Sequence, residues 1–319
     1  MLLVITHSKD ATADYLCGII AERGLPFVRF DTDQNLSDIK ISYAEGCPRL
    51  MMRDATYAVG AFRHVWLRRP KPLEVHIGGD ASEQAQAQKE WSEALEGFFA
   101  HIPFDAWMNH PSRNVTASHK MEQLTRASRF GLAIPDTLVT QHPEQLLAFW
   151  EQCDGEVVTK PLAEGYLYRE GEAADTTIYT RQVQPYHLDH IDTLVHCPTL
   201  FQQRIEKQTD VRICIVDDEV HAVAMEATDD GTAQRLDIRR HNMVDVSYSD
   251  IALPENVGAA LKKLIRSYEL RFAAIDVTVD RHGTWIFFEI NPNGQWAWLD
   301  LVAGTNIAEA FIRSFYAVE

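Results

Sequence analysis

The chain has 319 residues, 46% of them hydrophobic, and a formal net charge of −16. This length predicts a well-buried core divided between two or three domains. The acidic balance argues against a nucleic-acid partner, because phosphate contacts need clustered lysine and arginine. No apolar run of 18 residues occurs, so we expect a cytoplasmic protein without a membrane partner. The five cysteines are scattered and include no CxxC pair, which argues against a disulfide framework or a structural zinc site.

Residues 1–110 open with strand, helix and strand, and we expect a doubly wound α/β domain there. The strand "LLVIT" is followed by a helical pattern that Gly24 closes, and then by the strand "FVRFD". No GxGxxG follows the first strand, which argues against a dinucleotide site. A helix is expected near 82–100. The prolines at 103 and 111 mark the domain boundary.

The rest of the chain has an α+β pattern. Helices are expected near 117–130 and 143–152, and strands at "EVVTKPL" and "TTIYTRQV". After residue 200 come "LFQQRIE" and a hairpin that turns at 217–219. A helix near 255–270, a second hairpin and a last helix complete the chain.

The second hairpin joins "FAAIDVTVD" to "WIFFEIN" through "RHGT". If Asp280 pairs with Trp285, one hydrophobic face forms. That face places Val279, Val277 and Ile275 opposite Ile286, Phe288 and Ile290.

The other face of this hairpin then carries Asp276 directly opposite Glu289, with Asn291 two residues further on. Like charges directly opposite repel, so this pairing is unfavourable unless a cation lies between them. Three oxygen ligands on one face suit Mg²⁺, which takes carboxylates together with substrate phosphates. The alternative is a polar face exposed to solvent, and a slip of one residue would separate the two carboxylates.

The order Asp, then Glu-x-Asn at the end of an α/β chain resembles the metal signature of ATP-grasp ligases. The resemblance implies an N-terminal α/β domain (1–110), then a central (111–200) and a C-terminal domain (201–319) that clasp ATP. It implies that Lys120, in "ASHKMEQLTRASRFGLAIPDTLVT", and Lys160, in "VVTKPL", meet the nucleotide phosphates. Arg212 would face the phosphates, although it could instead form only an ion pair with Asp210.

The stretch "FQQRIEKQTDVRICIVDDEVHAV" resembles the hinge strand of the same family. The resemblance implies that the backbone of Gln203, Arg204 and Ile205 reads adenine. Either Glu206 or Asp210 would lie near the ribose. One departure from the family is the loop "AEGYLYREGEAADT" after Lys160, which is poorer in glycine than phosphate-covering loops usually are. Taken alone, Lys160 could be an ordinary surface lysine.

Three further stretches, "ITHSKDATADYLCGIIAERGLPFVRFDTD", "VWLRRP" and "RLDIRRHN", resemble the microviridin-type ATP-grasp ligases. Those enzymes convert ribosomally made precursor peptides, which carry a leader segment, into graspetides. The resemblance implies that Arg239 or Arg240 steadies the acyl phosphate or the acidic core peptide, since guanidinium matches both groups bidentately. The alternative for "RLDIRR" is a solvated basic turn. For Arg68 and Arg69 in "VWLRRP" we expect surface pairing.

The resemblance also implies the reaction. Asp or Glu side chains of the core peptide would be phosphorylated by ATP and joined to Thr, Ser or Lys side chains. We expect Thr or Ser hydroxyls and ω-esters, because an acidic protein opposes deprotonation of a lysine acceptor. Esters are also the commoner outcome that the resemblance implies. Alternatives are ω-amide links to Lys, a ligase that adds single amino acids to a peptide or protein carboxylate, and a nucleotide-binding protein without turnover. A homodimer is compatible with the resemblance.

Overall fold

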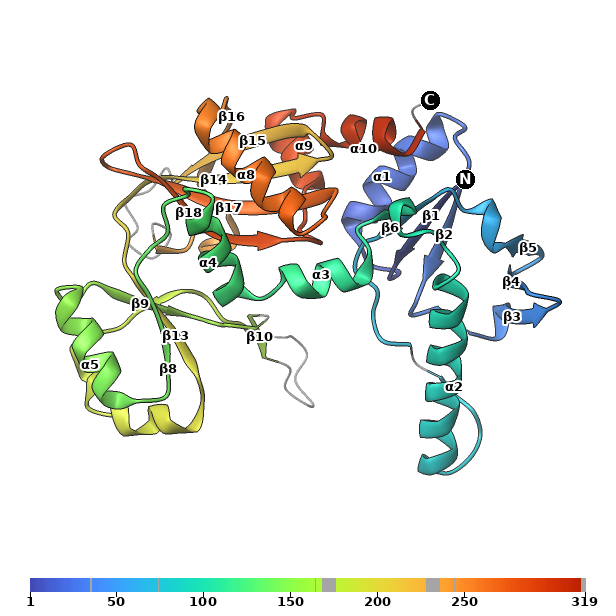
Figure 1. Ribbon diagram of the computed structural model, residues 1–319, viewed down its shortest axis with the longest axis horizontal. Helices are drawn as coiled ribbons and strands as arrows, with labels where there is room; N and C mark the ends of the chain where they lie inside the picture. The colour runs from blue at the N-terminus through green and yellow to red at the C-terminus, as the bar shows by residue number, and fades with distance from the viewer. Residues whose placement is uncertain are drawn as a thin grey trace.

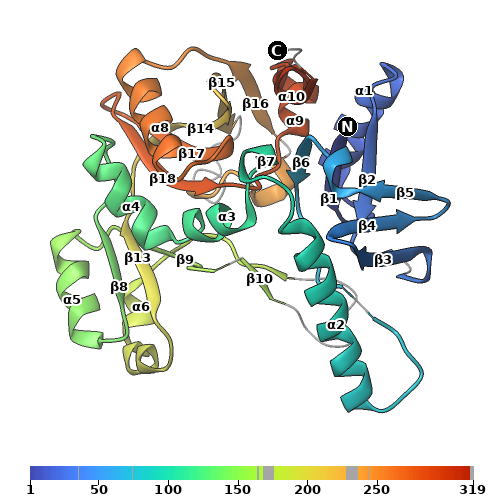
Figure 2. The ribbon, with the colours of Figure 1, turned by 45° about the vertical axis from the view of Figure 1, so that its right-hand side comes forward.

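The computed structural model describes residues 1–34, 36–73, 75–163, 165–167, 176–227, 236–243 and 245–316. The chain forms three regions. In Figure 1 the N-terminal one is blue to teal and the central one is green to yellow, and the C-terminal one is gold to red apart from its teal and green helices at 111–117 and 120–129. The N-terminal and C-terminal regions lie side by side in Figures 1 and 2, and the central region lies beneath the C-terminal one. None of the helices in this described part of the chain has both the length and the apolar composition of a membrane span.

The N-terminal region contains a parallel sheet with strand order β2-β1-β6-β7. Helix α1 packs on one face of the sheet through the side of Leu2 and Val4, and helix α2 lies over the other face, the side of Leu3 and Ile5. This arrangement confirms the doubly wound α/β fold. Its elements are β1 (Leu2–Thr6), α1 (Ala11–Glu22), β2 (Phe27–Asp31), β6 (His64–Leu67), α2 (Ala81–Phe99) and β7 (Trp107–Met108), with a separate small sheet of β3 (Ile39–Ala44), β4 (Cys47–Met52) and β5 (Ala55–Ala58).

The central region is an antiparallel sheet with strand order β12-β9-β13-β8. Helix α5 packs on it through Leu146 and Phe149, against Val157 and Phe201. Its elements are β8 (Thr137–Thr140), α5 (Pro143–Gln152), β9 (Val157–Lys160), β10 (Tyr166–Leu167), β11 (Thr176–Thr177), β12 (Arg181–Gln182), α6 (Pro185–Leu188) and β13 (Thr199–Gln203).

The C-terminal region is a five-stranded antiparallel sheet with order β16-β15-β14-β17-β18. Helices α4 and α8 cover one face, and helices α9 and α10 cover the other. Its elements are α3 (Pro111–Ala117), α4 (Lys120–Arg129), β14 (Lys207–Val216), β15 (Glu219–Ala227), β16 (Val246–Asp250), α8 (Glu255–Ser267), β17 (Phe272–Asp280), β18 (Trp285–Asn291), α9 (Ala297–Ala303) and α10 (Ile307–Tyr316). Helix α4 thus shares its core with C-terminal strands, and the domain division at 110 and 200 stays a prediction.

The hairpin of β17 and β18 has the expected register at one end and a different one at the other. Asp276 pairs with Glu289 as predicted. Beyond this pair the expected register is wrong, because a β-bulge makes Val277 pair with Phe287 and not with Phe288. Phe287 is therefore fully buried in the core. The extra residue, Phe288, turns to the face that carries the two carboxylates.

One aromatic cluster joins the N-terminal and C-terminal regions. Phe311 of α10 stacks on Trp296, with ring centroids 4.8 Å apart, and contacts Trp66 at the end of β6, with centroids 5.3 Å apart. The ring of Phe272, at the start of β17, lies 5.1 Å from Phe311. All four side chains are almost completely buried. The two regions consequently share a core rather than only a polar contact.

Phe311→Ala should destabilise the protein by about 3–5 kcal/mol, because it empties a space between rings from both regions. Urea denaturation followed by fluorescence measures this change. Leu301→Ala on the neighbouring helix α9 is the control, since Leu301 is 71% exposed and its truncation should cost less than about 0.5 kcal/mol. Equal effects of the two substitutions would contradict the shared core.

Candidate functional site

A cavity of about 1010 Å³ opens between the central sheet, the C-terminal sheet and the end of β6. Among the described residues, its lining includes seven lysines and arginines but only four aspartates and glutamates. The cavity is therefore basic, although the chain has a net charge of −16. Eleven of the sequence-predicted site residues line it, namely Lys120, Lys160, Gln203, Arg204, Ile205, Asp210, Arg212, Arg239, Asp276, Glu289 and Asn291.

The carboxylates of Asp276 and Glu289 lie together on the cavity wall. Asn291 Nδ2 donates to Asp276 Oδ2 at 3.0 Å and to Glu289 Oε1 at 3.5 Å. Arg212 Nη1 donates to Asp276 Oδ1 at 2.7 Å. Lys120 Nζ lies 3.4 Å from Glu289 Oε2. Each carboxylate thus has its own cation, and the ion pair of Arg212 is with Asp276 and not with Asp210.

The protein environment shifts the pKa values of these two carboxyl groups in opposite directions. Burial raises the pKa of Asp276, and Glu289 raises it further, against the opposing charge of Arg212. Burial also acts to raise the pKa of Glu289, but Lys160 and Lys120 outweigh it and hold that pKa below its usual value. Such opposite shifts in neighbouring groups are typical of functional sites.

The donor chemistry of Asp276, Glu289 and Asn291 fits a hard divalent cation. The described residues contain no group of three or more His, Cys, Asp or Glu placed to hold a metal ion, so the set consists of two carboxylates and one amide. The amide of Asn291 now donates to both carboxylates. Rotating it by 180° would present its oxygen instead, and the resulting all-oxygen set is what Mg²⁺ prefers.

Two lysines lie over the ring of Phe288. The Nζ atoms of Lys160, at the end of β9, and Lys207, at the start of β14, are 5.1 Å and 5.4 Å from the ring centroid. Burial lowers the pKa of Lys160, and the charges of Lys120 and Lys207 lower it further. Lys207 also lies 3.0 Å from Asp210 Oδ1. A partly desolvated group of cations favours an anionic ligand.

The position of Lys120 depends on a buried glutamine one turn further along α4. Gln123 donates to the Ile290 carbonyl at 2.9 Å, and its own oxygen accepts from the Ile290 N–H at 2.8 Å. These two bonds fix α4 against β18, next to Glu289. Lys120 Nζ additionally donates to the Leu162 carbonyl at 3.1 Å. Sequence reasoning missed both Gln123 and Lys207, because neither stands in a distinctive motif.

Arg239 faces the cavity because Asp237 holds it there. The two side chains form a bidentate pair, Nε to Oδ1 at 2.9 Å and Nη2 to Oδ2 at 2.7 Å. Asp237 is buried and also accepts from the Thr180 N–H at 3.1 Å. Burial opposes ionisation of Asp237, but the hydrogen bonds and charge of Arg239 lower its pKa to about 2.

Two predicted site residues are not in the lining of this cavity. Glu206 forms an exposed ion pair with Arg281, at 3.1 Å. Arg240 donates to the Thr180 carbonyl at 2.9 Å and lies over the ring of Tyr179. Residue 235 of "RLDIRRHN" and residues 164 and 168–175 of the loop after Lys160 lie outside the described part of the chain.

The segment from Gln203 to Ile205 connects the last strand of the central sheet to β14. Its backbone is anchored to the central region, where the Gln203 N–H donates to the Asp136 carbonyl at 2.9 Å and the Arg204 N–H donates to the Glu156 carbonyl at 2.8 Å. All three residues line the cavity. The segment is consequently a hinge-like link between the two sheets that enclose the site.

Two family models match the sequence. One describes an MvdD pre-ATP grasp domain and matches residues 1–114, and the other describes a RimK-like ATP-grasp domain and matches residues 117–315. No curated protein matches the chain.

Solved structures match almost the whole chain. The macrocyclase MdnC from Microcystis aeruginosa MRC, bound with the precursor peptide MdnA, is 27% identical with a TM-score of 0.84 and covers 99% of both chains. A RiPP-associated ATP-grasp ligase from Chryseobacterium gregarium, in complex with ADP and a leader and core peptide, is 28% identical with a TM-score of 0.87. It covers 98% of this chain and 96% of its own. The macrocyclase MdnB from Microcystis aeruginosa MRC is 25% identical, has a TM-score of 0.78 and covers 98% of both chains.

These similarities confirm the ATP-grasp fold and the resemblance to the microviridin-type ligases. Because the RimK-like model spans well over half of the sequence, the chain belongs to the RimK-like ATP-grasp family, and it is an ATP-grasp ligase.

Proposed function

We propose that this ligase uses ATP to activate Asp or Glu side chains of a ribosomally made precursor peptide and joins them to Thr or Ser hydroxyls as ω-esters. The observation that carries the proposal is the basic cavity built around Asp276 and Glu289. Such a cavity suits two anionic substrates, a nucleotide and an acidic peptide. The similarity to a macrocyclase bound with its precursor peptide supports a peptide as the second substrate.

The proposed reaction has two steps. A carboxylate oxygen of the peptide attacks the γ-phosphorus of ATP, the bond to the bridging oxygen breaks, and ADP leaves. A hydroxyl oxygen then attacks the acyl carbon and loses its proton, and inorganic phosphate leaves. Lys120, Lys160, Lys207 and Arg212 would neutralise the charge that develops on the transferring phosphoryl group. The lysines come from two different regions and line the same cavity.

Asp276, Glu289 and Asn291 would hold Mg²⁺, which supplies neutralisation of the phosphate oxygens when it is bound. The backbone of Gln203, Arg204 and Ile205 would contact the adenine. Asp210 is the better candidate for the ribose, because it lines the cavity and Glu206 does not.

Arg239 is the better candidate than Arg240 for contact with the acyl phosphate or the acidic core peptide, because Asp237 directs it into the cavity. Fixing a disordered peptide costs ordering entropy, which favours additional contacts to a leader segment. A homodimer and a cytoplasmic location stay predictions from the sequence.

Glu289→Gln should abolish Mg²⁺-dependent formation of ADP while leaving the fold intact, because it removes one charge from the metal site and keeps the shape. ADP release and circular dichroism measure the two effects. Glu219→Gln is the matched control, since Glu219 lies in the same sheet and pairs with Arg313 on the surface. Wild-type activity of Glu289→Gln would rule out the metal role.

Asp237→Asn should weaken modification and also destabilise the protein. The pKa of Asp237 falls from 3.8 to about 2 on folding, and a lowered carboxyl pKa adds stability that is present above about pH 4. That stability, about 2 kcal/mol, is lost as the pH falls through the folded pKa. The stability gap between wild type and variant should therefore be full at pH 7 and narrow below pH 4 in denaturant titrations. A gap that widens on acidification would contradict the assignment.

The bond itself is tested with a synthetic candidate precursor that contains Glu, Asp, Thr, Ser and Lys. Each link should remove one water, seen as a loss of mass, and only when enzyme, ATP and Mg²⁺ are all present. Mild alkaline hydrolysis should restore the water, because esters are more labile to base than amides. Links that survive base would show amides to Lys and overturn the ester proposal.

A further inference from the structure

The 291–295 loop begins at the last residue of β18, the proposed metal ligand Asn291. Hydrogen bonds to its backbone carbonyls hold this loop in place. Asn109 Nδ2 donates to the Pro292 carbonyl at 3.2 Å. Arg68 Nη1 donates to the Asn293 carbonyl, and Arg212 Nη2 donates to the Gln295 carbonyl at 3.2 Å. Two of these donors, Arg68 and Asn109, belong to the N-terminal region. The metal loop is thus held partly by a region that contributes no ligand to it.

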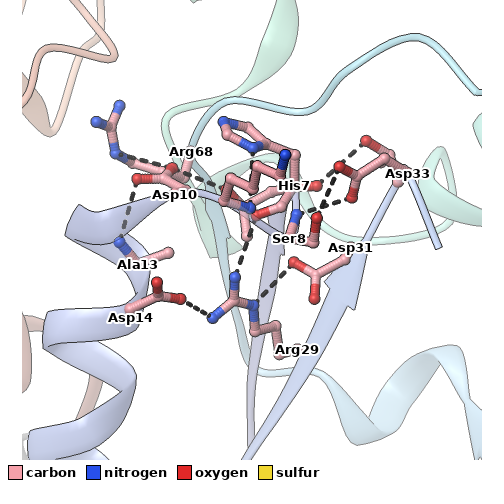
Figure 3. Close-up of polar contacts among 12 residues, drawn as sticks. His7, Ser8, Asp10, Ala13, Asp14, Arg29, Asp31, Asp33 and Arg68 are labelled. Atoms are coloured by element: carbon pink, nitrogen blue, oxygen red, sulfur yellow. Dashed lines mark hydrogen bonds and ion pairs between the residues drawn. The ribbon is translucent and has the colours of Figure 1, made fainter.

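Burying the charge of Arg68 is unfavourable for the free energy of folding. It is 1% exposed, so it is not the surface residue that its sequence neighbourhood predicted. Its carboxylate partner is Asp10, whose Oδ2 is 3.5 Å from Nε, as Figure 3 shows. Its Nε and Nη2 atoms make no hydrogen bond among the described residues. Burial lowers the pKa of Arg68 to about 10. A buried cation with such a loose partner usually destabilises a protein relative to an apolar residue.

The Asp10 carboxylate accepts three hydrogen bonds from groups other than Arg68. It caps helix α1 by accepting from the Thr12 N–H at 3.1 Å and the Ala13 N–H at 3.3 Å. It also accepts from the Thr6 hydroxyl at 2.8 Å. The capping of α1 therefore does not account for Arg68, and the bond to the Asn293 carbonyl is the contact that remains.

The packing around Gly294 shows what that contact achieves. A Cβ atom at Gly294 would lie 2.3 Å from the Ala274 Cβ and 2.6 Å from Arg212 Nη2, so the loop backbone rests directly on the C-terminal sheet. Arg68 and Arg212 hold the carbonyls on either side of this glycine. Arg212 is also the ion partner of Asp276. A displaced loop would move Asn291 and disturb that ion pair together.

We propose that Arg68 is a positioning residue, through which the N-terminal region fixes the 291–295 loop so that Asp276, Glu289 and Asn291 are preorganised for Mg²⁺. The inference rests on the metal site of the proposed function. Groups that orient metal ligands without touching the metal commonly change metal affinity about 10–100-fold when they are removed.

The test measures the affinity of the purified full chain for ATP as a function of Mg²⁺ concentration, by calorimetry, together with the thermal midpoint without ligands. Arg68→Met removes the donor and keeps the volume. The Mg²⁺ concentration needed for half-maximal ATP binding should rise about tenfold, and the thermal midpoint should fall, because the buried Asp10 carboxylate loses its cation. If Arg68→Met does not fold, Arg68→Lys, which loses the planar fork, is measured in the same way.

Arg29→Met is the matched control. Arg29 belongs to the same polar cluster in Figure 3, where it pairs with Asp14 and with Asp31 at 2.8 Å. Among the described residues it makes no hydrogen bond or ion pair with the 291–295 loop. Its removal should therefore lower the thermal midpoint and leave the Mg²⁺ dependence unchanged.

Unchanged Mg²⁺ dependence in the Arg68 variant would overturn the inference while the metal site stands. An equal shift in Arg29→Met would also overturn it, because Arg68 would then act only as a general stabiliser. If ATP binding to the wild type does not depend on Mg²⁺, the metal site of the proposed function fails, and this inference fails with it.

Discussion

Two carboxylates facing each other across neighbouring strands organise the rest of this molecule. Asp276 and Glu289 are directly paired in the ladder, an arrangement that repels unless cations offset it. The cations come from three separate elements: Arg212 from the adjacent strand β14, Lys120 from helix α4 and Lys160 from the central sheet. The site is therefore complete only when the central and C-terminal regions are assembled around it. This dependence links the tertiary arrangement directly to the charge balance at the carboxylates.

The β-bulge at Phe288 connects the same ladder to two lysines of the cavity, Lys160 and Lys207. Without the extra residue, strict alternation would place Phe288 in the core and Phe287 on the cavity face. With it, Phe287 packs inside and Phe288 offers its ring to Lys160 and Lys207. The sequence could not reveal this shift, because either phenylalanine of "FF" can fill the same core position. Hydrophobic alternation therefore predicted the Asp276–Glu289 pair correctly and failed only where two equivalent side chains were adjacent.

The sequence predicted the side chains that line the cavity better than the side chains that hold them in place. Strand periodicity predicted that Asp276 and Glu289 lie side by side. The resemblance to ATP-grasp ligases implied that Lys120, Lys160 and Arg212 share a site with them, and all five line one cavity. The sequence could not choose between Arg239 and Arg240, because the choice depends on a carboxylate two residues earlier, Asp237, becoming buried.

Arg68 shows the limit of local patterns most clearly. Its burial results from Asp10 at the start of α1 and from the 291–295 loop, which is more than 200 residues away in the chain. No window of sequence contains both partners. The expectation of a surface pair was therefore reasonable locally and wrong in the fold, because docking of the two regions removes this arginine from water.

The local charge of the cavity also bears on the acceptor group. Net charge favoured hydroxyl acceptors, since an acidic protein stabilises a lysine ammonium and so opposes its deprotonation. Charges act over about 10 Å in salt, however, so the cavity lining matters more than the whole chain. That lining holds seven basic and four acidic side chains among the described residues, and this excess lowers the pKa of a bound lysine. Inside the cavity, electrostatics therefore no longer favours a hydroxyl over a lysine as the acceptor. The ester proposal is supported by the family resemblance and not by the net charge of the protein.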